Sequence, residues 1–396
     1  MRAKLLVAAL ALLTASPAIT EPVGAEPPQV VELSGTAYER GRQHGEALRG
    51  EAADTVATVL RYFRGQLKVP IFGSRIVNFW LDRGWKAGQP FVSADVLEEL
   101  RGLSDGSGVP LRDLYRLHAL PDRTYTCSNF AAWGVRTQDG RLIHLRNLDW
   151  NIGAGIQHHP VIFVVRPAGK HAYINVSWAG FIGVLSGVND ATVSIGQVGA
   201  ETTDATLRGE PMVFLMRRVM EESGSVEDAA AIIQGARRTV GVNYVIAQAS
   251  ARRAIALETT ARASCAFSAD DKQERAVDYA RPLPDAVLRS DTAVDPSIRD
   301  RQVASAGNPR KPGLEPPLGS AYTIRYLKQA DALQESEGKL DIAGAQAIAA
   351  SIAPNSNVQS VIFAWPELWV ANAEGETPAA KTTYHRFDAE ALLTRR

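Results

Sequence analysis

The strongest constraint on the fold is a change of sequence pattern at Cys127. Before it, residues 35–67, Ala94–Leu103 and Leu111–Leu120 carry apolar side chains at helical spacing. After it, residues 128–198 carry short apolar or alternating runs that are separated by turn residues, which is typical of a meander of strands. The chain must therefore place a helical segment beside a largely antiparallel sheet.

The second half of the sequence returns to helices and then to strands. The stretch from Arg289 to Gly319 is rich in proline and charge and is expected to be a surface excursion. Helices that are segregated in sequence from antiparallel strands favour an α+β fold of packed layers over a doubly wound parallel sheet. The patterns predict helices at Pro211–Glu222, Ser225–Gln234, Ser320–Leu333 and Asp341–Ile352, and strand pairs in NYVIAQA with AIALETT and around Pro366.

The composition excludes several classes of partner. Lys and Arg number 43, Asp and Glu also number 43, and the formal net charge is 0. This balance gives no electrostatic basis for binding nucleic acid or an anionic membrane. After the first twenty residues no apolar run is long enough to span a bilayer. We expect no membrane span, and no motif calls for a cofactor.

The first 25 residues have the pattern of a cleavable export signal. Arg2 and Lys4 precede the apolar stretch Leu5–Leu13, and small residues lead to Ala25. The apolar stretch is much shorter than the roughly 20 residues that a membrane span needs. We expect cleavage after Ala25, with Ala18 as the second choice, and a secreted or periplasmic protein.

The two cysteines, Cys127 and Cys265, allow two interpretations. An exported chain with an even number of cysteines usually pairs them, so one interpretation is a disulfide in a non-catalytic binding protein. In the other, Cys127 stays free and acts as a nucleophile. A thiol attacks carbonyls as its thiolate and has a reference pKa of about 8.5, so it needs a base or a cation nearby.

Cleavage of the bond between Thr126 and Cys127 would supply such a base. The freed α-amino group, with a reference pKa of about 8, would lie on the same residue as the thiol. Downstream, the run RNLDW carries Arg146, which could favour the thiolate, and Asp149, which could hold an ammonium or orient the arginine. These two residues would face opposite sides of a regular strand, so both can reach one site only if the segment bends or turns. The alternative is a structural salt bridge or solvated charges at the end of a strand.

The histidines offer two other kinds of site. A papain-like enzyme would pair Cys127 with a histidine, but none lies in a recognisable frame. The pair His158 and His159 has no carboxylate or cysteine at ligand spacing, so we expect no metal site. The histidines available for such pairing are His118, His144, His158, His159 and His171.

Five runs occur in the order and approximate spacing of a known family: CSNFAAWG, RNLDW, GVNDATVSIGQ, VNYVIAQA and SAYTIRY. From about Gly35 onward the chain resembles the cysteine N-terminal-nucleophile hydrolases, in particular the branch of the acyl-coenzyme A:6-aminopenicillanic acid acyltransferase. It is more distantly similar to the choloylglycine hydrolases, which include penicillin V acylases. The run GTAYERGRQHG, at residues 35–45, is also similar to the segment that precedes the nucleophile in the acyltransferase branch. The resemblance implies a four-layer αββα sandwich.

The resemblance also implies how the chain is divided and what the central residues do. Residues 26–126 would form a mostly helical small fragment after self-cleavage, and residues 127–396 the catalytic domain. Cys127 matches the nucleophile that becomes N-terminal. Arg146 matches the residue that steadies the sulfur, and Asp149 the residue that holds the new α-amino group.

Three further residues match the polar network of the family. Asn189 matches a residue whose backbone N–H helps to form the oxyanion hole, and Asn243 matches the side-chain amide donor of that hole. Arg325 matches a second arginine. From the residues alone, Asn189 could be only a turn former, Asn243 could tie a loop, and Arg325 could cover the core with its stem.

The implied function is an exported amidohydrolase that cleaves an N-acylated small molecule through a thioester on Cys127. The two fragments would stay associated. An acyltransferase is the alternative, and is less favoured because an exported enzyme would meet little acyl-coenzyme A. One departure is Thr126, where the family enzyme has glycine before its cysteine. A β-branched residue is expected to make self-cleavage slower. Substrate and oligomeric state are left open.

Overall fold

The computed structural model describes residues 26–66, 73–121, 126–277, 279–302 and 321–395. The expected export signal lies outside these residues, as do the four residues before Thr126. Within the described residues, no helix is both long enough and apolar enough to cross a membrane.

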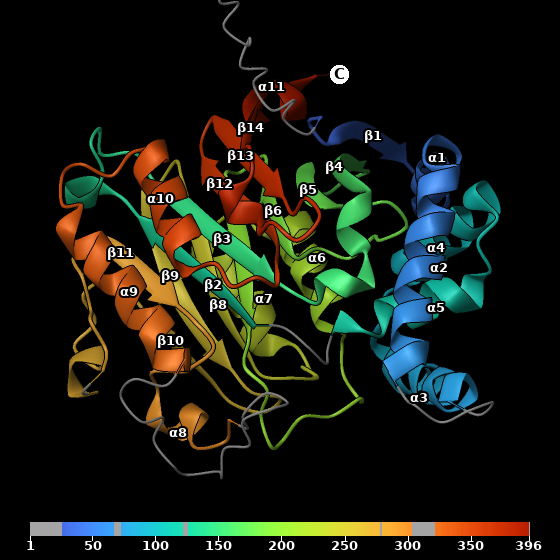
Figure 1. The fold of residues 1–396 in the computed structure, drawn as a ribbon, viewed down its shortest axis with the longest axis horizontal. Helices are drawn as coiled ribbons and strands as arrows, with labels where there is room; N and C mark the ends of the chain where they lie inside the picture. Colours follow the sequence, from blue (N-terminus) through green and yellow to red (C-terminus); the bar gives the residue numbers. More distant parts are fainter. Residues whose placement is uncertain (1–25, 67–72, 122–125, 278, 303–320, 396) are drawn as a thin grey trace, which may run out of the picture.

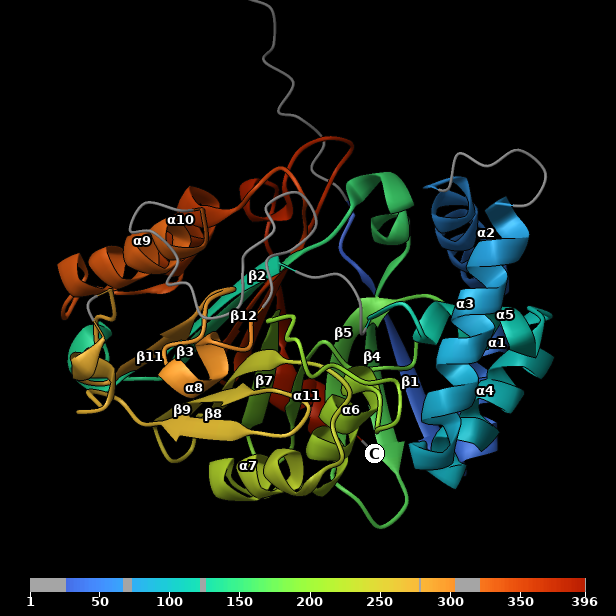
Figure 2. The ribbon, with the colours of Figure 1, turned by 90° about the horizontal axis from the view of Figure 1, so that it is seen from below.

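Two β-sheets pack face to face at the centre of the molecule (Figures 1 and 2). One apolar cluster between them joins Phe130 and Leu145 of the smaller sheet to Val245 of the larger sheet. The larger sheet has the order β1 (Gln29–Gly35), β4 (Pro160–Pro167), β5 (Tyr173–Trp178), β6 (Ser186–Asn189), β7 (Val193–Gly199), β8 (Val242–Gln248), β9 (Arg253–Thr259) and β10 (Ser264–Phe267). The smaller has the order β11 (Ala286–Arg289), β2 (Thr126–Ala132), β3 (Ile143–Asp149), β12 (Asn357–Ala364), β13 (Glu367–Asn372) and β14 (His385–Asp388).

Helices cover the outer face of each sheet. On the larger sheet, α6 (Met212–Glu222) packs on β6 and β7, and α7 (Val226–Gly235) packs on β8 and β9. On the smaller sheet, α9 (Ala321–Glu335) packs on β2 and β11, and α10 (Ile342–Ile352) packs on β3 and β12. The predicted α+β fold and its αββα layering are therefore confirmed.

The N-terminal segment forms a helical arm at one end of the sandwich (Figure 1). Its first strand, β1, joins the larger sheet parallel to β4, and neither β1 nor the helix α3 (Gly73–Gly88) was expected from the sequence. The single helix expected over residues 35–67 is two helices that meet at Leu48. The arm consists of α1 (Ala37–Ala47), α2 (Arg49–Gln66), α3 (Gly73–Gly88), α4 (Ala94–Ser107) and α5 (Leu111–His118).

Glycines on both helices allow α1 and α4 to pack backbone against backbone. A Cβ on Gly41 would lie 1.9 Å from the Glu99 carbonyl oxygen, and a Cβ on Gly102 would lie 2.0 Å from the Tyr38 carbonyl oxygen. Both distances are far too short for any side chain. The glycine-rich pattern is thus a helix-packing device of the arm.

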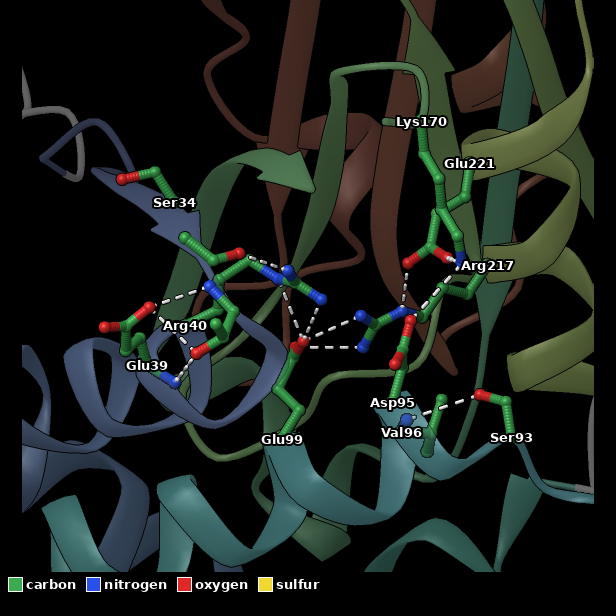
Figure 3. Close-up of polar contacts among 12 residues, drawn as sticks. Ser34, Glu39, Arg40, Ser93, Asp95, Val96, Glu99, Lys170, Arg217 and Glu221 are labelled. Carbon is green, nitrogen blue, oxygen red and sulfur yellow. Dashed lines mark hydrogen bonds and ion pairs between the residues drawn. The ribbon is translucent and has the colours of Figure 1, made fainter. Parts of the chain in front are cut away.

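A buried network of charges attaches the arm to helix α6, which covers the larger sheet (Figure 3). Glu99 on α4 accepts hydrogen bonds from Arg217 on α6, at 2.9 and 2.7 Å, and from Arg40 on α1, at 3.1 Å. Arg217 also binds Glu221 at 2.7 Å, and Lys170 binds Glu221 at 2.6 Å. The Glu99 and Arg217 side chains are 3% and 1% exposed, so this ion pair is buried where the arm meets α6, and removing one partner would leave a buried charge unpaired.

The expectation of a surface excursion after Arg289 is wrong for residues 289–302. Arg289 is fully buried and forms ion pairs with Glu258, at 2.6 Å, and with Glu274. Its charge is neutralised inside the protein, so a charged sequence here does not mean exposure. The segment continues into a short helix, α8 (Pro296–Arg299), and the chain closes with α11 (Ala389–Thr394).

Candidate active site

Cys127 lies at the start of β2, the strand between β11 and β3 in the smaller sheet. The ladder pairs Cys127 with Leu148 and Thr126 with Asp149, so the RNLDW run is the neighbouring strand. This pairing is continuous through Arg146 and Asp149, and the one register shift beside it lies on β12, between Asn357 and Gln359. Cys127 itself is fully buried.

Arg146 brings a cation to the sulfur. Its Nη2 lies 3.5 Å from Cys127 Sγ. Its Nη1 donates to Ser186 Oγ at 3.1 Å, and its Nε donates to the Gln197 carbonyl oxygen at 3.4 Å. Ser186 and Gln197 belong to β6 and β7 of the opposite sheet. The interface of the two sheets therefore holds the guanidinium beside the thiol.

Gly196 on β7 leaves the space that Arg146 occupies. A Cβ at this position would lie 2.8 Å from Arg146 Cγ and 2.5 Å from Asn129 Nδ2. Both atoms are enclosed between the sheets, because Arg146 and Asn129 are fully buried. Any side chain at position 196 would displace the guanidinium from the sulfur.

The thiol of the uncut chain is a weak acid. Burial is the largest effect and raises the pKa of Cys127 to about 11. The Arg146 charge acts in the opposite direction, whereas the nearby carboxylates Asp149 and Asp291 raise the pKa further. At neutral pH the sulfur therefore carries its proton, and the guanidinium alone does not produce a thiolate.

Asp149 is held by two groups at the end of β3. Arg325 Nη1 on α9 donates to its Oδ2 at 2.8 Å and to the Cys127 carbonyl oxygen at 3.2 Å. Asn357 Nδ2 on β12 donates to its Oδ1 at 3.0 Å. Burial raises the pKa of Asp149 to about 7, against the lowering effect of Arg325. This carboxyl therefore titrates near neutral pH.

Asp291 is a second carboxylate beside Cys127. Its Oδ1 accepts the backbone N–H of Cys127 at 3.1 Å, and its Oδ2 lies 3.6 Å from Arg325 Nη1. Burial raises its pKa, while Arg325 and the Cys127 N–H lower it. The nitrogen, carbonyl oxygen and sulfur of one residue are thus each contacted by a charged side chain.

The two predicted asparagines lie in different places. Asn243 on β8 is fully buried, its Nδ2 donates to the Ser290 carbonyl oxygen at 2.9 Å, and its Oδ1 has no hydrogen-bond partner. It therefore lies beside the segment that carries Asp291. Asn189 binds the end of α6 instead, through the carbonyl oxygens of Met220 and Ser223. No described contact joins the Asn189 side chain to Cys127.

Asp291 and Asn357 were not predicted from the sequence. Asp291 lies two residues after Arg289, the last residue of the run AVLR, and RNLDW likewise places an aspartate shortly after an arginine at the end of an apolar strand. Assigning residues 289–319 to a surface excursion concealed this signal. Asn357 carries no comparable signal, because its role depends on the pairing of β12 with β3.

The alternative sites gain no support from the described residues. Cys127 and Cys265 are free thiols on different sheets, so the disulfide of the non-catalytic interpretation is not formed. His144 lies with Ser194 Oγ at 2.7 Å and Asn129 Oδ1 at 2.9 Å, and no described histidine is hydrogen-bonded to Cys127. In the same part of the chain, no cluster of three or more His, Cys, Asp or Glu side chains could hold a metal ion.

Comparison with known proteins agrees with the resemblance seen in the sequence. Residues 135–277 match the family model described as acyl-coenzyme A:6-aminopenicillanic acid acyl-transferase. Arg146, Asp149, Asn189 and Asn243 lie inside the matched region, and Cys127 and Arg325 lie outside it. The predicted resemblance to this family is confirmed.

Individual relatives share low sequence identity with this chain. Protein dcd1B of Dictyostelium discoideum is 27% identical over 281 residues, which cover 66% of this chain and 56% of that protein. Acid ceramidase of Rattus norvegicus is 25% identical over 175 residues, which cover 38% of this chain and 43% of that protein. The chain thus spans about half the length of the curated relatives it matches. Among solved structures, the Caenorhabditis elegans N-acylethanolamine-hydrolyzing acid amidase ortholog aligns with a TM-score of 0.43 at 14% identity, covering 60% of this chain and 92% of that one.

Proposed function

We propose that this chain, which carries a domain of the acyl-coenzyme A:6-aminopenicillanic acid acyl-transferase family, is a self-processing amidohydrolase with Cys127 as its nucleophile. The observation that carries the proposal is the 3.5 Å contact between Arg146 Nη2 and Cys127 Sγ at the buried start of a central strand. A structural cysteine needs no cation. A sulfur that becomes negatively charged during reaction does.

The thiol acidity explains why processing would be needed. With a pKa of about 11, roughly one sulfur in ten thousand is a thiolate at pH 7. An α-amino group on the same residue has a reference pKa of about 8 and can take the thiol proton. Cleavage before Cys127 therefore converts an unreactive thiol into a nucleophile with its own base.

The proposed reaction on substrate has two stages. The sulfur attacks the carbonyl carbon of an N-acylated small molecule, and the amine leaves with a proton from the α-ammonium group. Water then hydrolyses the thioester. An Nδ2 hydrogen of Asn243 not used by Ser290 is available as an oxyanion donor, and such a donor contributes about 3 kcal/mol. The backbone N–H of Asn189 remains a predicted second donor.

The fragments are proposed to remain together after cleavage. Support comes from the buried Glu99–Arg217 contact between the arm and α6, and from β1, which is part of the larger sheet. Export to a secreted or periplasmic location is proposed on the pattern of residues 1–25 alone. No cofactor is required for either stage of the reaction.

The proposal is tested first by intact mass and N-terminal sequencing of the purified protein. Two fragments, the larger beginning at Cys127, are expected. The processed protein is then incubated with phenoxyacetyl, fatty-acyl and aminoacyl amides, and with ceramide because of the name of the rat relative. Release of amine without a donor supports the hydrolase. An acyltransferase is the second candidate, because the matched family is named for acyl transfer. Activity that requires an acyl thioester donor would establish the acyltransferase in place of the hydrolase.

A further inference from the structure

The backbone nitrogen of Cys127 has a carboxylate of its own. Asp291 Oδ1 accepts the Cys127 N–H at 3.1 Å, although the two residues are 164 positions apart in the chain. The Asp291 side chain is 7% exposed, so little water competes for this contact. In the proposed self-cleavage, this nitrogen leaves the carbonyl carbon of Thr126 and must gain a proton.

Asp149 is engaged elsewhere. Its Oδ2 accepts from Arg325 at 2.8 Å and its Oδ1 accepts from Asn357 at 3.0 Å. No described contact joins its carboxylate to the Cys127 nitrogen. The side chain that the structure places on this nitrogen is Asp291.

The segment that carries Asp291 is fixed from several sides. Glu258 accepts the backbone N–H groups of Val294, at 2.7 Å, and of Asp295, at 2.8 Å. Gln302 Nε2 donates to the Asp291 carbonyl oxygen at 3.2 Å. A carboxylate held in this way needs little reorganisation when the nitrogen beside it changes its bonding.

We infer that Asp291 is a catalytic residue of self-cleavage, which protonates the Cys127 nitrogen as the peptide bond breaks and afterwards holds the resulting α-ammonium group. This inference rests on the proposed function, and it assigns to Asp291 the contact with the amino group that the family resemblance assigns to Asp149. Arg325, 3.6 Å from Asp291 and 2.8 Å from Asp149, links the two carboxylates.

Self-cleavage balances with one water as its only further reactant. The Sγ–C bond to Thr126 forms, the C–N bond breaks, and one proton moves from sulfur to nitrogen. Asp291 donates a proton to the nitrogen and is reprotonated by the proton that the thiol loses. One water then hydrolyses the thioester, which leaves a carboxyl group on Thr126 and restores the Cys127 thiol. Burial raises the pKa of Asp291, which favours the protonated form that this role needs.

The test compares Asp291→Asn with the wild-type chain during cell-free synthesis, with intact mass measured over time. An asparagine oxygen can still accept the Cys127 N–H but cannot exchange a proton. The expected result is at least tenfold slower cleavage, with partial recovery in Asp291→Glu. The matched control is Asp295→Asn, which removes a carboxylate from the cap of α8 in the same segment. It is expected to cleave at the wild-type rate.

A second measurement reads the α-amino group in processed protein. Its reaction with an amine reagent is followed by mass against pH, and Asp291→Asn is expected to lower its pKa by about one unit. Cleavage of Asp291→Asn at the wild-type rate would overturn the inference. An uncut wild-type chain would overturn both the inference and self-processing. A wild-type chain that cleaves but hydrolyses no amide would count against the proposed amidase and leave the role of Asp291 standing.

Discussion

Asn357 Nδ2 donates a hydrogen bond to Asp149 Oδ1 at 3.0 Å, between residues that face each other across β12 and β3. The same asparagine accepts the backbone N–H of Ala380 at 2.8 Å. The buried side chain of Asn357 therefore holds both the Asp149 carboxyl group and the backbone at Ala380.

Replacing Asn357 with alanine should destabilise the fold and raise the pKa of Asp149. The change leaves a buried carboxylate oxygen and a backbone N–H without partners, at a cost of about 2 kcal/mol. Urea unfolding measures the loss. Asn372→Ala, at a half-buried position on β13 of the same sheet, is the control and should cost less. Equal losses in the two variants would show that Asn357 does no more than an ordinary sheet residue.

Replacing Cys127 with alanine should leave a single chain without amidase activity, because the proposed self-cleavage and the proposed attack on substrate both need the sulfur. Cys265→Ala should cleave like the wild type, since Cys265 lies on β10 of the other sheet and is not part of the site. Intact mass separates the two results. A Cys127→Ala chain that still splits before position 127 would refute self-processing.

Replacing Arg146 with methionine should move the alkaline rise of the cleavage rate to higher pH. The guanidinium lowers the pKa of Cys127, so its loss raises that pKa above about 11. A shift of one pH unit or more is expected in rate profiles measured by intact mass. Arg146→Lys should shift less, because it keeps the charge but loses the contacts of the guanidinium fork. An unchanged profile would place Arg146 outside the chemistry.

Replacing Glu99 with glutamine should weaken the attachment of the helical arm. Arg217 and Arg40 would keep their charges without the shared carboxylate, at a cost of about 3 kcal/mol. The urea concentration that separates the arm from the sheets should fall, as measured by gel filtration of cut protein or by unfolding of the uncut chain. Glu46→Gln breaks the exposed pair with Arg42 and should change stability by less than about 0.5 kcal/mol.

Stability should fall in mild acid because of buried neutral histidines. Burial lowers the pKa of His118 to about 4, and its Nε2 accepts the Ile182 N–H at 3.0 Å. Between about pH 6.5 and pH 4, His118 binds a proton in the unfolded chain but not in the folded chain. The free energy of unfolding therefore decreases as the pH falls. His118→Gln should remove about 3 kcal/mol of this dependence between those pH values. Parallel pH profiles for variant and wild type would contradict the assignment.

The contribution of Asp149 to the free energy of unfolding has the opposite pH dependence. Its pKa is raised to about 7, so the folded chain binds a proton that the unfolded chain has released, and this contribution weakens folding as the pH rises from about 4 to about 7. Asp149→Asn should remove that trend and should be measured beside His118→Gln. A stability profile of Asp149→Asn that keeps the wild-type slope would show that Asp149 is already ionised in the folded chain.

Local patterns in the sequence predicted the layers, because strand alternation and helical spacing are properties of neighbouring residues. The helices expected to start at Ser225 and Asp341 are α7 and α10, and the side chains of these two residues cap them. The contacts that assemble the site are different in kind. Asp291 meets Cys127 across 164 positions and Asn357 meets Asp149 across 208, and such pairings depend on the register of distant strands. The export signal, the cleavage and the role of Asn189 remain predictions.

Strand β1 gives the arm a second significance. All seven of its residues, from Gln29 to Gly35, pair in parallel register with β4, so the polypeptide before Cys127 supplies the edge of a sheet whose other strands all follow Cys127. Without it, the buried apolar strand β4 would present a bare row of N–H and C=O groups, and such a row invites pairing with other copies. We therefore expect the segment before Cys127 to protect the sheet edge from aggregation. A chain produced from Cys127 onward should precipitate unless residues 26–66 are supplied with it.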